Sequence, residues 1–60
     1  MLTKQQLTQQ IREKERRLHQ LQLQAAQQGI NVDPGITLEI EDIEQELGRL
    51  HRQLATAPDG

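Results

Sequence analysis

Apolar residues recur along two segments of the chain at alternating spacings of four and three residues, and we call these two rows the seam. The first row consists of Leu7, Ile11, Lys14, Leu18, Leu21, Ala25 and Gln28. The second row consists of Ile36, Ile40, Ile43, Leu47, Leu50, Leu54 and Ala57. This spacing returns side chains to one face of a slightly underwound helix. The pattern therefore predicts two amphipathic helices and an all-α fold.

Local signals set the expected ends of these helices. Thr3 followed by Gln6 fits a capping box, in which each side chain bonds the other residue's backbone N–H. Gly29 is suited to a helix end, because the residue just past a helix often needs a positive φ. Asp33 and Pro34 fit an N-cap and a first helical residue. We expect helices over residues 3–28 and 34–55, joined by a turn over 29–33 that contains Gly29, Asp33 and Pro34.

A connection of about five residues forces the two helices to lie antiparallel, as a helical hairpin. Matched outward from the turn, the seam predicts three levels of contact. These are Ala25 with Ile36 and Ile40, Leu18 with Ile43 and Leu47, and Ile11 with Leu50 and Leu54. We expect residues 1–56 to form the hairpin and residues 57–60 to form a tail or linker.

Size and composition indicate that one hairpin needs a partner. The chain has 60 residues, no cysteine and no aromatic residue, so disulfides and large aromatic side chains cannot stabilise it. We expect a homodimer, with a higher oligomer as an alternative, in which two hairpins form a four-helix bundle. The predicted core and interface residues are Leu7, Ile11, Leu18, Leu21, Leu23, Ile36, Leu38, Ile40, Ile43, Leu47, Leu50 and Leu54.

Leu23 and Leu38 lie off the seam near the turn, where with Ile30 and Val32 they would form a second apolar surface. We expect a partner to cover this surface. The alternative is that both leucines fold over the turn and cover it themselves.

Lys14 stands where the seam requires an apolar residue. Its aliphatic stem is expected to pack while its ammonium reaches Glu46 or water. Alternatively, it fixes the register and the oligomer number. Exposed ion pairs are also expected between Arg16 and Arg17 on one helix and Glu44 and Glu46 on the other.

Several kinds of chemistry are not expected in this chain. His19 and His51 lack further ligands at metal spacing, and the twelve residues from Asp33 to Glu44 carry Leu38 at the glycine position of a calcium loop. We expect no cofactor, no metal and no enzymatic activity, because two thin helices cannot enclose a catalytic pocket. No apolar run could span a membrane, so a cytoplasmic location is expected.

The residues from Gln27 to Ile43 resemble a short helical hairpin of bacterial multidomain signalling and conflict proteins. The similarity lies in the turn proline Pro34, in Ile36 and Leu38, and in the run Glu39-Ile40-Glu41-Asp42-Ile43 that leads into a Leu/Arg/Glu heptad. Members of that family often carry two prolines where this chain has Asp33 and Pro34. The resemblance implies an oligomerising or adaptor segment beside effector domains or NACHT-type NTPase domains of a longer polypeptide.

Three functions remain open at this stage. The first is homo-oligomerisation through the seam. The second is an RNA-binding hairpin dimer that uses Lys4, Arg12, Lys14, Arg16 and Arg17. The net charge of −2 and the interleaved Glu13 and Glu15 make nucleic acid an unexpected partner. The third is docking on a helix of a different protein, for which the isolated chain would be poorly folded.

Overall fold

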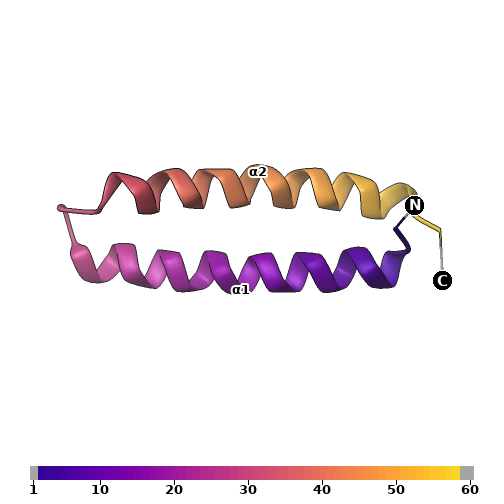
Figure 1. The fold of residues 1–60 in the computed structure, drawn as a ribbon, viewed down its shortest axis with the longest axis horizontal. Helices are drawn as coiled ribbons and strands as arrows, with labels where there is room; N and C mark the ends of the chain where they lie inside the picture. Colours follow the sequence, from indigo (N-terminus) through magenta and orange to yellow (C-terminus); the bar gives the residue numbers. More distant parts are fainter. Residues whose placement is uncertain (1, 59–60) are drawn as a thin grey trace.

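The computed structural model describes residues 2–58, and the helix and strand statements below refer to these residues. They form two α-helices, α1 (Lys4–Gln28) and α2 (Pro34–Thr56), and contain no strand. The helices lie side by side and antiparallel, with the turn at one end and the start of α1 beside the end of α2 at the other (Figure 1). The predicted all-α hairpin is confirmed, and each helix end lies within one residue of its predicted position.

The start of α1 is fixed by the predicted capping box. The Thr3 hydroxyl accepts a hydrogen bond from the Gln6 backbone N–H at 3.2 Å, and the Gln6 side-chain oxygen accepts one from the Thr3 N–H at 2.9 Å. Two N–H groups that the first helical turn leaves unpaired are thereby satisfied. Thr3 is the cap itself, so the helix begins at Lys4.

Gly29, Asp33 and Pro34 shape the turn, and the Gln28 side chain stabilises it. Gly29 has φ 66° and ψ −131°, a backbone conformation that residues with a Cβ rarely adopt. Asp33 caps α2, since its carboxylate accepts a hydrogen bond from the Gly35 N–H at 2.8 Å, and Pro34 occupies the first turn. The Gln28 side chain accepts a hydrogen bond from the Asp33 N–H at 2.9 Å, which ties the two helix ends together.

Gly29→Ala is expected to lower the free energy of unfolding by about 1 kcal/mol, because alanine strains the positive φ although its Cβ meets open space. Gly48→Ala is the matched control. Gly48 lies inside α2 with open space around it, so the same substitution there should stabilise the helix by roughly 1 kcal/mol. Urea unfolding followed by circular dichroism compares the two variants, and equal effects at both positions would contradict the assigned turn.

The core of the hairpin is the seam. Five of its side chains are buried, with exposed fractions of 9% or less: Leu7, Ile11, Leu21, Ile43 and Leu47. All of them except Leu7 form one cluster, and five partly buried side chains pack against that cluster: Leu18, Ile36, Ile40, Leu50 and Leu54. The two helices therefore share one thin row of aliphatic contacts and no further layer.

At the end opposite the turn, the start of α1 is hydrogen-bonded to a residue that follows α2. The Lys4 N–H donates a hydrogen bond to the Pro58 carbonyl at 3.1 Å, which places residue 4 level with residue 58. Ala57 is half-buried, and its N–H donates to the Leu54 carbonyl at 3.3 Å. Residues 57 and 58 of the predicted tail therefore contact the hairpin. Residue 1 of the predicted domain and residues 59–60 of the predicted tail lie outside the described residues.

Candidate interaction surface

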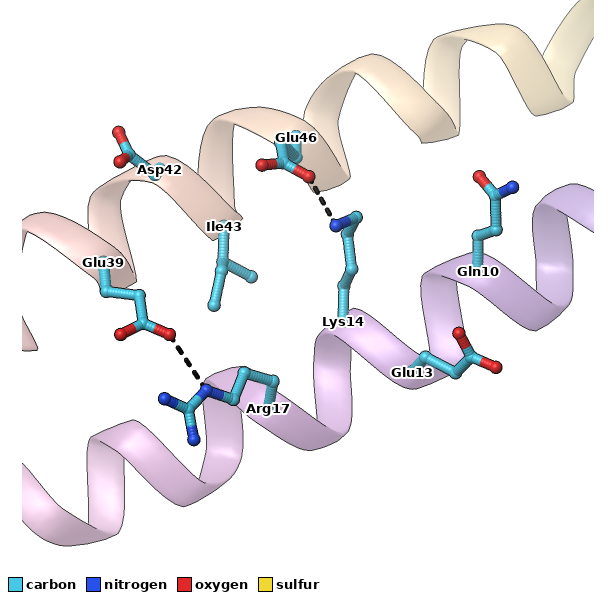
Figure 2. Close-up of a pocket in the computed structure, with 8 residues that line it drawn as sticks. All are labelled: Gln10, Glu13, Lys14, Arg17, Glu39, Asp42, Ile43 and Glu46. Atoms are coloured by element: carbon cyan, nitrogen blue, oxygen red, sulfur yellow. Dashed lines mark hydrogen bonds and ion pairs between the residues drawn. The ribbon is translucent and has the colours of Figure 1, made fainter.

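One face of the hairpin carries charged side chains from both helices, and we call it the ion-paired face. A shallow, open groove runs along it between α1 and α2 (Figure 2). Its lining consists of Gln10, Glu13, Lys14, Arg17, Glu39, Asp42, Ile43 and Glu46. Because the groove is open to water and every lining residue except Ile43 is polar or charged, it does not provide the enclosed, apolar setting that small-molecule sites favour.

Two ion pairs cross this groove from α1 to α2 (Figure 2). The Lys14 ammonium lies 2.5 Å from a Glu46 carboxylate oxygen, and the Arg17 Nε donates to Glu39 at 2.9 Å. Lys14 keeps 37% of its side chain exposed, so its stem packs at the seam while its charge reaches the surface. The polar position in the seam is thus compensated by Glu46, as the sequence predicts.

The expected pairing of Arg16 and Arg17 with Glu44 and Glu46 is wrong in detail. Arg17 pairs with Glu39 instead, and Arg16 makes no ion pair with any described residue. The reason is rotation about the helix axis. Glu39 and Glu46 are seven residues apart and share a face, whereas Glu44 lies about 200° from Glu46 at 100° per residue. Two charged residues at the same level along the helix axis therefore pair only if their side chains also lie on the same face.

The pKa of Glu46 is lowered below its usual value of 4.5, chiefly by the hydrogen bond from Lys14, then by the charge of Lys14, with a further contribution from Arg49. A carboxylate whose pKa is lower in the folded state than in the unfolded state stabilises the fold above the unfolded value, and this contribution is lost on acidification.

We therefore expect the Lys14–Glu46 contribution to be present above pH 4.5 and to disappear as the pH falls through the lower folded value. An NMR titration of the Glu46 carboxyl checks this directly. In Lys14→Gln, the same carboxyl should titrate closer to 4.5. Superimposable titration curves for the two proteins would show that the ion pair is absent in solution.

Apolar side chains are exposed at the turn end of the hairpin. Leu23 is 52% exposed, Leu38 is 60% exposed and Ile30 is fully exposed, while Val32 is half-buried. The alternative in which Leu23 and Leu38 fold over the turn and cover it does not hold. Each lies close to the side of its helix opposite the seam, so neither side chain can bend back across the turn.

The twelve predicted interface residues thus fall into two groups, and the predicted turn residues form a separate third set. Ten of the twelve line the contact between the helices, as five buried and five half-buried side chains. Leu23 and Leu38 are exposed on the outer surface, on the sides of their helices away from the seam. The predicted turn residues Gly29, Asp33 and Pro34 all lie in the connection or in the first turn of α2.

The sequence interpretation missed Leu2. Leu2 lines the same hollow as Leu7, together with Gln53 and residues at the end of α2, and Leu7 is only 1% exposed. Leu2 precedes the N-cap and Leu7 is the fourth helical residue, which is the spacing of a hydrophobic staple. This signal was present beside the capping box and could have identified the contact.

Two further properties of the described residues bear on function. Among residues 2–58, no group of three or more His, Cys, Asp or Glu side chains could hold a metal ion. Neither α1 nor α2 is sufficiently long and apolar to cross a membrane.

Comparison with known proteins found no matching family model, curated protein or solved structure. The function is therefore inferred from the residues and geometry described above.

Proposed function

We propose that this hairpin is a non-catalytic homo-oligomerisation module, in which two copies pair to form a four-helix bundle. The observation that supports the proposal is the incomplete burial of the seam. Of the side chains in residues 2–58, five hydrophobic ones are buried, and Leu18, Ile36, Ile40, Leu50 and Leu54 stay half-buried beside them.

The shape of the hairpin accounts for this incomplete burial. The described residues form two helices that lie side by side over a length of 44 Å, and no third element covers either broad face (Figure 1). A single helix contact cannot surround an aliphatic side chain, and a chain of this length buries too little apolar area to offset the entropy of ordering it. A second hairpin laid on the first would cover the exposed half of the seam.

One of the two broad faces is better suited to this contact. The ion-paired face is flanked by charged side chains that already cross between the helices. On the opposite face, which we call the open face, the outer row of the seam repeats every seven residues on each helix. This row consists of Ile11, Leu18, Ala25, Ile40, Leu47 and Leu54. We place the partner hairpin on the open face, away from the two ion pairs that cross the groove.

The ion pairs also bear on the RNA-binding alternative. Lys14 and Arg17 are two of the cations that would contact phosphates, and both are paired with glutamates of α2. A paired cation has less charge to offer a phosphate backbone. Homo-oligomerisation is therefore the better supported function. Within a longer polypeptide, such pairing would bring attached domains together.

Thermal unfolding at several protein concentrations tests the proposal. A dimer that unfolds to monomers gains about 1.4 kcal/mol of apparent stability for each tenfold rise in concentration, so its Tm should rise by several degrees. A Tm that does not change between micromolar and millimolar protein would contradict the proposal. A chain that is poorly helical at every concentration and folds only with another protein would instead favour hetero-association.

A further inference from the structure

We infer that the two hairpins pair on the open face with their turn ends together, so that Leu23 of each copy packs against Leu38 of the other. This inference rests on the proposed homodimer and adds the orientation of its two chains. Its basis is the row of side chains along the outer edge of each helix.

Each helix carries three exposed residues, seven apart, on the side directly away from the seam. On α1 they are Gln9, Arg16 and Leu23, and on α2 they are Leu38, Gln45 and Arg52. At 100° per residue these positions lie along the outer edges of the hairpin, about 90° from the centre of the open face. Positions at such an angle flank the contact when a second helix packs on that face, as the flanking charges of a coiled coil do.

The three levels along the two edges coincide. Arg16 is the middle residue of α1 (Lys4–Gln28), and Gln45 is the middle residue of α2 (Pro34–Thr56). The hydrogen bond from Lys4 to Pro58 and that from Asp33 to Gln28 fix this register at the two ends. Leu23 is therefore level with Leu38, but on the opposite edge of the same hairpin.

A two-fold axis along the hairpin keeps both turns at one end and places α1 of each copy on α2 of its partner. The edges then meet as matching pairs. Leu23 lies against the partner's Leu38, and this apolar contact occurs twice in the dimer. Arg16 lies against the partner's Gln45, and Gln9 lies against the partner's Arg52, so neither arginine meets another cation.

A two-fold axis across the hairpin places the turns at opposite ends and lays α1 on α1 and α2 on α2. Arg16 then meets the partner's Arg16 at the axis, where two like charges repel. Leu38 meets the partner's Arg52, and Leu23 meets the partner's Gln9, so four leucines stay against polar groups. Glu15 and Glu44 approach carboxylates in both arrangements and do not distinguish them.

The charge distribution supports the same orientation. From Leu18 to Leu38 the only formally charged side chain is Asp33, and it is occupied in capping α2. Two turn ends can therefore approach with little electrostatic repulsion. Together they cover the exposed Leu23 and Leu38, and they bring the two fully exposed Ile30 side chains to the same end.

Pulsed electron resonance distances between spin labels test the orientation. The chain has no cysteine, so Asn31→Cys provides a single label in the exposed turn of each copy. With the turns together, the two labels should lie within about 25 Å, because only the width of a helical bundle separates them. With the turns apart, their separation approaches the 44 Å length of the hairpin.

Gln20→Cys provides the control, since Gln20 is exposed and lies near the middle of α1. Labels there should be within roughly 30 Å in either orientation, since few 1.5 Å steps separate them along the axis. A long Asn31 distance with a short Gln20 distance would overturn the inferred orientation and leave the dimer intact. The absence of any interspin distance at both sites would overturn the dimer and the orientation together.

Discussion

Leu21→Ala is expected to lower the free energy of unfolding by about 3 kcal/mol and to leave most of the protein unfolded at room temperature. Leu21 is 2% exposed and belongs to the cluster that contains Ile11, Ile43 and Leu47. The substitution removes three buried carbons from a core of five side chains, and so few neighbours cannot fill the cavity that is left. Circular dichroism at 222 nm during urea unfolding measures the loss.

Gln20→Ala is the matched control for this variant. Gln20 is the preceding residue in α1 and is exposed on the side of the helix away from the open face, and alanine favours the helix at least as well as glutamine does. Its free energy of unfolding should change by less than about 0.5 kcal/mol. If both substitutions destabilised the hairpin equally, Leu21 would not lie in the core.

Lys14→Leu is expected to have the second largest effect, with the opposite sign. Lys14 stands at a seam position and keeps its ammonium at the surface beside Glu46. Leucine would bury more apolar area there, worth about 1.5 kcal/mol, whereas the ion pair that is lost is solvent-exposed and contributes little. The Tm should therefore rise.

Lys14→Leu also tests whether the lysine restricts the oligomer number. Removing a polar group from a helical seam widens the choice of assemblies. Analytical ultracentrifugation should therefore show species beyond the dimer in this variant. Lys14→Met, which keeps an unbranched aliphatic stem but no charge, separates the loss of charge from the change of shape. A lower Tm in both variants would show that the ion pair outweighs the burial of apolar area.

Much of the fold was predictable because it depends on local capping and turn signals and on the regular spacing of apolar residues along each helix. The capping box at Thr3, the glycine at Gly29 and the Asp33-Pro34 pair fixed the helix ends within one residue. The spacing of four and three residues defined the contact face, and the short turn then left only an antiparallel arrangement. The partner that Lys14 finds in Glu46 followed from the same register.

The details that escaped prediction depend on rotation about each helix and on side-chain reach. Arg17 pairs with Glu39 and not with Glu44 at its own level, because Glu39 lies on the same face of the hairpin and Glu44 does not. Leu23 and Leu38 could have covered the turn, and only their position opposite the seam excludes this. The position of Leu2 beside the hollow that Leu7 also lines follows a capping rule that a search for seam spacing does not detect.

Both proposals depend on a hairpin that cannot bury its seam alone. Sedimentation equilibrium of the full chain at micromolar concentration, with helicity recorded on the same sample, tests this claim most directly. We predict a helical species with about twice the chain mass of 6.9 kDa. A fully helical, cooperatively unfolding species of 6.9 kDa would contradict it.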